Sequence, residues 1–370
     1  MSTSERDNFG IVGGYGATGQ AVVAELSKSG NRRILIGGRD LTKGKALAAE
    51  FGSQVTAAHL DVLDARSLDN FCSQCSIVVN CAGPVKALQD RVAQAAFRQH
   101  CHYVDPAGMS IVAERMRDKS REIADLGLCF VVSAGWMPGV IEVASAYAHA
   151  QATAQMDTID SVAVYSGDSG EWSVNALRDG VWYIRKVGLK NPGYFRKGTW
   201  VRATRSEAFP MVTLGDPLGT RRFGMFFSPE LNEIGRQLKD CDVLAYSYLS
   251  GFRTILSSIL IAALPLPESV GVRLLRNVFR RNHRLSVGGF VAARVLGRSQ
   301  GRQRILTVQT TYPAHHDYWI HGLAMATVAG MVAEGQTQRG VHFLADAVDS
   351  KAFMTRLQAA GVEQTESVDL

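Results

Sequence analysis

The segment Gly13-Gly14-Tyr15-Gly16-Ala17-Thr18-Gly19 constrains the fold of this 370-residue chain more than any other feature. It follows a short apolar run, Phe9–Val12, and precedes a segment with helical spacing of apolar residues, Thr18–Ser29. Glycines in a G-x-G-x-x-G pattern let a strand turn tightly into a helix and let the backbone approach a pyrophosphate. The start of such a helix offers free amide groups to an anion. We therefore predict a dinucleotide site made of Gly14, Tyr15, Gly16, Ala17, Thr18 and Gly19.

Strand-like and helix-like segments alternate over the first third of the chain. The expected strands after the first are Arg33–Ile36, Val55–Leu60, Ile77–Val79, His102–Val104 and Leu128–Val132. The expected helices between them are Leu41–Phe51, Ala65–Cys72, Leu88–His100 and Ile111–Asp125. Repetition at this interval implies a parallel sheet with helices on both faces. The predicted fold class is thus α/β, with a Rossmann-type doubly wound parallel sheet.

The pattern changes after Pro138. Phe290–Leu296 and Arg304–Thr311 resemble the arms of an antiparallel hairpin, and Tyr318–Glu334 is typical of a helix. We expect residues 1–138 to form the dinucleotide domain. Residues 139–334 should form a second α+β domain with a mixed or antiparallel sheet, for substrate binding and dimerisation. We expect the remaining segment, 335–370, to pack back onto the first domain.

The end of the second strand indicates which dinucleotide binds. An NAD-binding chain usually carries an acidic residue there for the ribose 2′-hydroxyl. This chain instead has Gly38 followed by Arg39, whose guanidinium can bind a 2′-phosphate, and Lys43 adds positive charge. Asp40 is interpreted as the N-cap of the next helix. The expected cofactor is therefore NADPH or NADP+ rather than NAD(H).

Two further loops follow strands at the carboxyl edge of the sheet, where such sheets bind ligands. Asp61 and Val62 follow the third strand and are expected near the adenine. The loop after the fourth strand is expected near the nicotinamide ribose, and it comprises Asn80, Cys81, Ala82, Gly83 and Pro84. A plain strand-to-helix turn is the alternative for each loop.

Composition limits the partners. The net charge of +6 is not gathered into a tail, and no nucleic-acid-binding pattern is present. The apolar run Ile255–Leu266 is too short to cross a bilayer, and no secretory signal opens the chain, so we predict no stable membrane insertion and a cytoplasmic location. Cys72 and Cys75 lack a second ligand pair, so no metal site is predicted. The stripe Arg273, Arg276, Arg280 and Arg284 is interpreted as a solvated helix face, with a partner surface as the alternative.

Several of these segments together carry a family resemblance. Gly13–Gly19, Gly38-Arg39-Asp40, Val79–Pro84 and His102–Asp105 with Gly108 resemble the NADP-binding domain of the saccharopine dehydrogenase/saccharopine reductase family. Ala134–Gly139 is similar to the segment where that family enters its substrate domain, and Gly340–Phe343 resembles its closing segment. The resemblance is good over residues 9–145 and loose from 146 to 330. It implies hydride transfer from NADPH to a C=N bond.

The proton donor and the substrate contacts are predicted in two places. Tyr103 and Asp105 lie at the carboxyl edge of the sheet as candidate catalytic residues, and His316 is a candidate in the second domain. Trp136, Met137, Trp172 and Tyr318 are candidate substrate contacts. For His316, the alternative is an exposed loop residue beside a helix cap at Asp317.

We thus predict a two-domain, biosynthetic, NADPH-dependent oxidoreductase that performs imine reduction or reductive amination on a small metabolite. The first alternative is a trans-acting enoyl reductase, which reduces a C=C bond of a carrier-bound or lipid-like substrate. An aromatic-rich middle region, which favours a substrate less charged than saccharopine, is compatible with it. The second alternative is a non-catalytic NADP(H)-binding regulator. A homodimer is the expected assembly.

Overall fold

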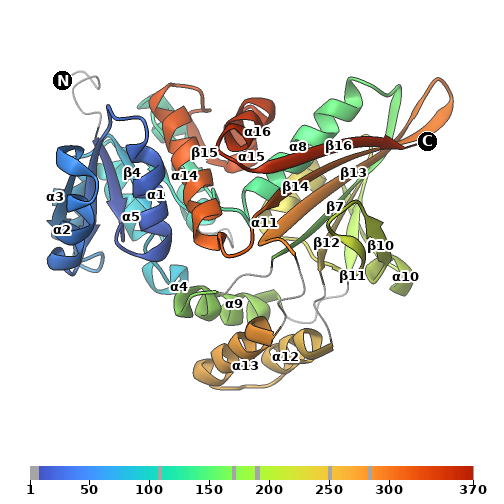
Figure 1. Cartoon of the computed structure of the whole chain (residues 1–370), viewed down its shortest axis with the longest axis horizontal. Helices are drawn as coiled ribbons and strands as arrows, with labels where there is room; N and C mark the ends of the chain where they lie inside the picture. The colour runs from blue at the N-terminus through green and yellow to red at the C-terminus, as the bar shows by residue number, and fades with distance from the viewer. Residues whose placement is uncertain are drawn as a thin grey trace. The chain divides into compact units, whose positions relative to one another are not determined.

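The computed structural model describes residues 8–106, 111–168, 172–187, 192–248, 252–281 and 286–369. The chain divides into two compact units, shown in Figure 1. The first comprises Met1–Val140 and Tyr318–Ala360, and the second comprises Ile141–Asp317 and Gly361–Leu370. The observed division after Val140 lies two residues from the expected boundary.

The first unit is built on a seven-stranded sheet in the order β15-β6-β5-β4-β1-β2-β3, and all its pairs are parallel. Its strands are β1 (Asn8–Val12), β2 (Arg33–Gly38), β3 (Val55–His59), β4 (Ile77–Asn80), β5 (His102–Val104), β6 (Cys129–Val132) and β15 (Gly340–Phe343). The chain runs outward from β1 to β3 and then returns to β4 on the other side of β1. This reversal is the point at which open α/β sheets bind ligands.

Helices cover both faces of this sheet. They are α1 (Ala17–Ser27), α2 (Leu41–Ala49), α3 (Ala65–Cys72), α4 (Val85–Leu88), α5 (Arg91–Arg98), α6 (Ile111–Met116), α7 (Ser120–Asp125), α14 (Asp317–Ala333), α15 (Leu344–Ala347) and α16 (Ser350–Ala359). Two neighbours on β2 show why both faces are used. Ile36 faces Gly44 of α2, whereas Gly37 faces Phe71 of α3. Adjacent strand residues point to opposite faces, so the predicted doubly wound sheet is confirmed.

The expected helix Leu88–His100 is divided into α4 and α5. Gln89 between them has a φ of 54°, a left-handed conformation that an α-helix does not contain. Asp90 then precedes α5, and its carboxylate accepts a hydrogen bond from the Gln94 amide (3.0 Å). The break shortens the helix without changing its place in the fold.

Helix α14 belongs to the first unit, although we predicted it in the second domain. A Cβ added to Gly322 would lie 2.4 Å from Ala21 Cβ, so α14 and α1 approach each other closely there. One turn earlier, Trp319 Nε1 donates to Glu25 Oε1 at 2.9 Å. Figure 1 shows α14 in orange beside the blue α1. Small residues at a crossing let two helices pack this tightly. The sequence of Tyr318–Glu334 predicted a helix, but it did not indicate which of the two sheets that helix covers.

The second unit contains a nine-stranded mixed sheet with the path β10-β11-β12-β7-β13-β14-β16, and β8 pairs with β12 and β9. Its strands are β7 (Thr158–Asp168), β8 (Gly193–Arg196), β9 (Thr199–Arg202), β10 (Met211–Leu214), β11 (Gly219–Met225), β12 (Asp242–Tyr248), β13 (Gly289–Ser299), β14 (Arg302–Tyr312) and β16 (Glu363–Asp369). The β7–β12 pair is parallel and the other pairs are antiparallel. A second domain with a mixed sheet is thus confirmed.

The C-terminal segment differs from its expectation. We predicted that 335–370 packs onto the first domain, and β15 does join the sheet there beside β6. However, β16 pairs with β14 in the second sheet. Residues of β16 are largely polar and exposed, which is typical of an edge strand held by its backbone rather than by a buried face.

The helices of the second unit are α8 (Val140–Thr153), α9 (Val174–Val187), α10 (Arg205–Ala208), α11 (Pro229–Gln237), α12 (Phe252–Ala263) and α13 (Glu268–Arg281). Helices α9, α12 and α13 share an apolar cluster of Leu177, Val181, Ile261 and Leu275. The arginine stripe begins on α13 with Arg273 and Arg276, which are both exposed. The side chains of Arg280 and Arg284 lie outside the described residues. Among the described helices, none is long and apolar enough to cross a membrane.

Candidate functional site: a dinucleotide cradle

The glycine loop leaves β1 and enters α1 with its backbone tightly folded. Gly13 has a φ of +74°, and its carbonyl accepts a hydrogen bond from the Gly16 amide (2.9 Å). A Cβ at Gly19 would lie 2.4 Å from the Gly13 oxygen and 2.6 Å from Gly14 Cα. Only glycine fits at 19, because the loop backbone occupies the space that a side chain needs.

The start of α1 is open to an anionic ligand. Gly16 occupies the N-cap position, and no side chain among the described residues caps the helix there. Gly16 and Ala17 are exposed. The first-turn amides of a helix have no partner within the helix and carry partial positive charge. The predicted pyrophosphate-binding geometry is therefore present at this loop.

The loop after β4 lies against the glycine loop. The Cys81 amide donates to the Val12 carbonyl (2.9 Å), and a Cβ at Gly13 would lie 3.2 Å from Ala82 Cα. The Asn80 side chain holds this loop, since its Oδ1 accepts from the Ala82 amide (3.1 Å) and its Nδ2 donates to the Tyr103 hydroxyl (3.2 Å). The structure thus brings two of the predicted cofactor segments together at the point where the strand order reverses.

The other flank of the glycine loop carries the residues predicted to select the cofactor. Gly38 lies under the Tyr15 ring, and Tyr15 Oη accepts from the Asp40 amide (3.0 Å). Asp40 Oδ1 accepts from the Lys43 amide (3.1 Å), so its predicted role as the N-cap of α2 is confirmed. Lys43 Nζ is 3.7 Å from the same carboxylate. Arg39 is exposed and pairs with no other described residue, so its guanidinium is available to a phosphate.

Asp61 and Val62 follow the third strand as expected, but the hydrogen bonds of Asp61 are made within the turn itself. Asp61 Oδ1 accepts from the Leu63 amide (2.9 Å), and its backbone amide donates to Ser67 Oγ (3.0 Å). Val62 packs against the core of the first unit. These contacts fit the alternative of a structural turn, and a contact with adenine stays a prediction.

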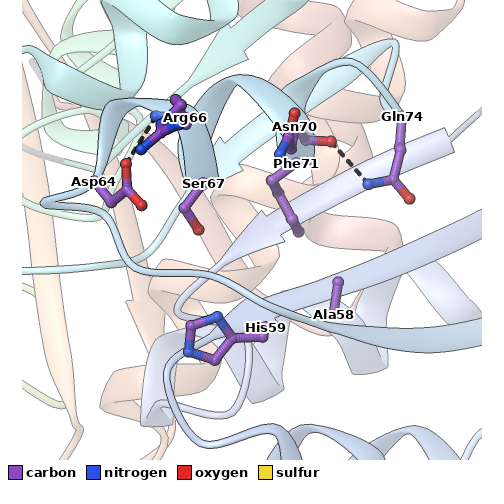
Figure 2. Close-up of a pocket in the computed structure, with 8 residues that line it drawn as sticks. All are labelled: Ala58, His59, Asp64, Arg66, Ser67, Asn70, Phe71 and Gln74. Carbon is purple, nitrogen blue, oxygen red and sulfur yellow. Dashed lines mark hydrogen bonds between the residues drawn. The ribbon is translucent and has the colours of Figure 1, made fainter.

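A polar pocket of about 430 Å³ lies beside this turn, between the edge strand β3 and helix α3 (Figure 2). His59, at its rim, pairs in register with Gly38 on β2. Several lining groups bond to one another, including Gln74 Nε2 to the Asn70 carbonyl at 2.8 Å. The lining residues are Ala58, His59, Asp64, Arg66, Ser67, Asn70, Phe71 and Gln74. The residues predicted to contact the cofactor do not line it, so this pocket is separate from the glycine-loop cradle.

Tyr103 and Asp105, the predicted catalytic pair, lie at the end of β5 with no exposed surface. Asp105 Oδ1 accepts from the Ser133 amide (3.3 Å), and the Asp105 side chain also bonds to Tyr103. Burial, and then the charge of Asp105, hold the pKa of Tyr103 well above its usual value. This network joins the ends of three strands, because Asn80 ends β4 and Ser133 directly follows β6. The geometry suits positioning of the cofactor loops better than direct contact with a substrate.

The turn after β6 contains Trp136 and Met137, which were predicted to contact substrate. Trp136 is 1% exposed, and its backbone amide donates to Nδ1 of His321 on α14 (3.2 Å). Gly139 has a φ of +129°, and a Cβ there would lie 2.3 Å from the Gly135 oxygen. Burial lowers the pKa of His321 to about 4. The imidazole is therefore neutral, and it can accept the Trp136 hydrogen bond at neutral pH.

The remaining candidates occupy different units. Tyr318 is half-buried at the start of α14 in the first unit. His316 is exposed in the second unit, with Nδ1 2.9 Å from the Ala314 oxygen. Trp172, also in the second unit, stacks on Phe279 at 4.7 Å and donates to Asp168 Oδ1 (3.4 Å). Asp317 is the first residue of α14, and its carboxylate accepts from the Tyr312 hydroxyl (2.9 Å).

Two features of the site were not predicted from the sequence. His321 stands one helical turn after Asp317, and its position on an otherwise apolar helix was the available signal. The second feature is a pair of carboxylates in the second unit, Glu142 and Glu230, each 2% exposed. Ser228 Oγ donates to Glu142 Oε1 (3.1 Å). Burial, followed by the charges of Glu230 and Glu142, raises the pKa of the half-buried Tyr183 hydroxyl. Acidic residues are rarely buried so completely without a specific role.

Comparison with known proteins identifies the first unit. Residues 9–131 match the family model described as the saccharopine dehydrogenase NADP binding domain. The N-terminal domain is thus similar to the NADP-binding domain of this family. The resemblance stated above for the glycine loop, the Gly38-Arg39 step and the Asn80 loop is therefore confirmed, as is NADP(H) as the cofactor. The glycine cradle and the unpaired Arg39 fit that cofactor.

Full-length relatives extend the comparison more loosely. A saccharopine dehydrogenase-like oxidoreductase of Rattus norvegicus is 25% identical over 251 residues, covering 63% of this chain and 56% of the relative. A lipid droplet localized protein of Caenorhabditis elegans is 26% identical over 212 residues, covering 54% and 48%. This chain thus spans about half the length of these relatives. Apo saccharopine dehydrogenase (L-Glu forming) of Saccharomyces cerevisiae superposes with a TM-score of 0.70 at 14% identity, covering 98% of this chain and 100% of that chain. That likeness confirms the predicted two-domain fold class.

Proposed function

We propose that this protein is an NADPH-dependent oxidoreductase that transfers hydride to the C=N bond of a small metabolite. The observation that carries this proposal is the NADP-binding domain itself, with an open helix N-terminus and an unpaired arginine at the 2′-phosphate position. Relatives named saccharopine dehydrogenase-like oxidoreductases support hydride chemistry on an amino-acid-like substrate. When bound, NADPH supplies the hydride, and the protein must orient the acceptor and provide a proton.

In this proposal, most of the named residues hold the loops around the cofactor in place and do not themselves react. Asn80 fixes the loop beside the glycine turn, and Tyr103 with Asp105 fixes Asn80. His321 on α14 fixes the Trp136 turn through its hydrogen bond with the Trp136 amide. Precise placement of a bound group contributes strongly to rate, since small displacements at the reacting atoms are costly. His316 remains our candidate proton donor, because it is exposed and carries an imidazole.

The preference for a C=N bond rests on the buried carboxylates of the second unit. An imine and the amine formed from it are basic, and they carry positive charge when protonated. Glu142 and Glu230 offer buried negative charge that would stabilise such a cation far more strongly than water-exposed carboxylates. An uncharged enoyl thioester gains nothing from them. We therefore propose an amine-bearing substrate, with these two carboxylates as its recognition groups.

A substrate panel tests the reaction. The purified chain is incubated with NADPH and pairs of aldehydes or 2-oxo acids with amines, and the nicotinamide absorbance is followed. We expect oxidation of NADPH with at least one pair, with Glu230→Gln raising KM for the amine while leaving the Kd of NADPH unchanged. Activity restricted to enoyl thioesters would overturn the C=N assignment. Tight NADPH binding with no turnover on any substrate would favour the non-catalytic regulator.

The enoyl reductase remains a second candidate because helix α12 exposes apolar side chains. Leu256 is 40% and Ile259 41% exposed, and Leu264, directly after the helix, is 45% exposed. The basic helix α13 comes next. A carrier-bound or lipid-like substrate would suit such a surface. The Caenorhabditis elegans relative is named for lipid droplets. Turnover of an acyl-carrier-linked enoyl substrate, lost on Leu256→Asp and Ile259→Asp together, would favour this candidate.

We further propose a cytoplasmic enzyme whose partners are a small-molecule substrate and a second copy of the chain. Neither nucleic acid nor stable membrane insertion is part of the proposal. Light scattering after size-exclusion chromatography tests the dimer directly. A monomer at micromolar concentration, with full activity, would contradict it.

A further inference from the structure

A histidine, an aspartate and a cysteine converge in the second unit, outside every residue considered so far. His149 lies near the end of α8, and Asp240 and Cys241 immediately precede β12. One ligand atom from each side chain lies within 4.8 Å of the other two. His149 Nε2 is buried and has no hydrogen-bond partner among the described residues. A buried polar atom left without a partner is costly and calls for an explanation.

These three side chains are ligand types that zinc prefers, namely an imidazole nitrogen, a thiolate and a carboxylate oxygen. Ideal tetrahedral coordination would place their ligand atoms roughly 3.4 to 3.6 Å apart. The three ligand atoms lie within 4.8 Å of one another, so each would have to move by about 1 Å or less to reach that spacing. We propose that His149, Asp240 and Cys241 bind a zinc-class divalent transition-metal ion, with water as the fourth ligand. The ion would supply the partner that His149 Nε2 lacks.

The three proposed ligands lie at different depths below the surface of the second unit. Cys241 is fully buried, His149 is half-buried and Asp240 is exposed. An ion among them would sit at the edge of the unit, with its fourth position on the side of Asp240 and solvent. When the metal–sulfur bond forms, the thiol proton leaves to solvent and the sulfur binds as thiolate. The ion therefore neutralises charge that the buried sulfur would otherwise hold at high cost.

Asp240 is the carboxylate of the cluster. The next carboxylate along the chain, Asp242, is instead paired with Arg196 at 3.9 Å.

The proposed ion would link helix α8 to the start of β12 in the second unit, and both elements are labelled in Figure 1. His149 brings α8, and Cys241 brings the start of β12. The Cys241 carbonyl accepts from the amide of Lys197 (3.2 Å), which lies in the turn between β8 and β9. A structural zinc site contributes its binding free energy to folding. The sequence spacing concealed this site, because His149 is far from the other two ligands in the chain.

Cobalt provides a direct test, since Co2+ occupies zinc sites and reports a thiolate ligand by its absorption. The untagged full chain, treated with chelator, is titrated with CoCl2 and then with ZnCl2. We expect one equivalent of Co2+ to produce visible bands of a four-coordinate site and a sulfur-to-cobalt charge-transfer band in the near ultraviolet. Zn2+ should remove both, and should raise the Tm. The absence of any saturable cobalt spectrum would overturn the proposal.

Variants assign the ligands. Cys241→Ser should abolish the charge-transfer band, and His149→Gln and Asp240→Asn should each weaken Co2+ binding at least tenfold. Cys129→Ser, a buried cysteine of the first unit, is the matched control and should leave the spectrum unchanged. Asp240 is exposed, so Asp240→Asn should keep the native circular dichroism spectrum. If the other variants fail to fold, the Co2+ affinity of Asp240→Asn alone tests the site. A charge-transfer band that survives Cys241→Ser, or wild-type affinity in Asp240→Asn, would refute the site.

Discussion

Replacement of Arg39 by alanine tests whether this residue binds the 2′-phosphate of NADPH specifically or contributes to anion binding in general. Arg39 follows Gly38 at the end of β2, where the 2′ position of the adenosine ribose is expected. Its guanidinium makes no ion pair with another described residue, so the substitution breaks no internal contact of the protein. Any loss of affinity then reports the contact with ligand. We expect Arg39→Ala to weaken NADPH binding and to leave NADH binding almost unchanged.

The expected magnitude follows from the exposure of the side chain. A hydrogen bond to a charged group contributes about 1.5 to 3 kcal/mol. Because Arg39 is exposed, water competes for the phosphate and the lower part of this range applies, about 1.5 to 2 kcal/mol. At about 1.4 kcal/mol for each factor of ten, the Kd of NADPH should rise ~10- to 30-fold. NADH lacks the 2′-phosphate, so Arg39 could contact only its adenine. The Kd of NADH should therefore change less than about threefold.

The assay is a titration of both cofactors, by calorimetry or nicotinamide fluorescence, at fixed ionic strength. Arg33→Ala is the matched control, since Arg33 is an exposed arginine at the opposite end of the same strand. It should leave both affinities unchanged. The NADPH effect should also shrink with added salt, because exposed charges are screened over about 8 Å at 0.15 M ionic strength. Equal losses for NADPH and NADH would refute the phosphate assignment.

Three further substitutions examine the same domain. Asp40→Asn keeps the helix cap and removes a carboxylate beside the phosphate, so NADPH should bind about 2- to 5-fold tighter by titration; weaker binding would contradict this. Gly19→Ala places a Cβ 2.4 Å from the Gly13 oxygen and should abolish NADPH binding, whereas Gly215→Ala, with no atom closer than 3.8 Å, should not. The folded pKa of His321 is about 4, below the unfolded value of 6.5, so the unfolded state binds more protons between these values and stability falls as pH is lowered through this window. His321→Asn should reduce that fall by about 2 to 2.5 kcal/mol, measured by urea unfolding at pH 7 and at pH 4.5. An unchanged fall would show that His321 is not its cause.

The cofactor half of the molecule was predictable because its determinants are local. The glycine spacing, the helix cap at Asp40 and the apolar strand before Asn80 each express a rule that operates within a few residues. The strand ends then bring these segments together automatically, since all parallel strands finish at one edge of the sheet. The sequence pattern therefore predicted both the residues of the cradle and their proximity.

The second half was predictable only as a class. The aromatic residues of the middle region were interpreted as a sign of a weakly charged substrate. In the structure Phe223 is fully buried and contacts Tyr165, and Phe195 packs edge-on against Trp200 and Phe227. Phe223, Tyr165 and Phe195 are buried in the core of the second unit, whereas Trp200 is 46% exposed. Aromatic content alone cannot distinguish core from cavity. The pairing of β16 with β14 likewise depends on a strand more than fifty positions away, for which a polar segment gives no local signal.

His321 shows most clearly why the site needed a structure. An apolar helix with one histidine is ambiguous, because the partner of that histidine is a backbone amide in a distant turn. Once α14 packs on α1 through Gly322 and Ala21, the imidazole reaches the Trp136 amide. The turn that follows β6 is thereby fixed by a helix that the sequence pattern assigned to the other domain. If His321 proves essential for NADPH turnover, it should act by holding the backbone of residues 135 and 136. His321→Asn keeps a hydrogen-bond acceptor and should therefore retain activity, whereas His321→Leu should not.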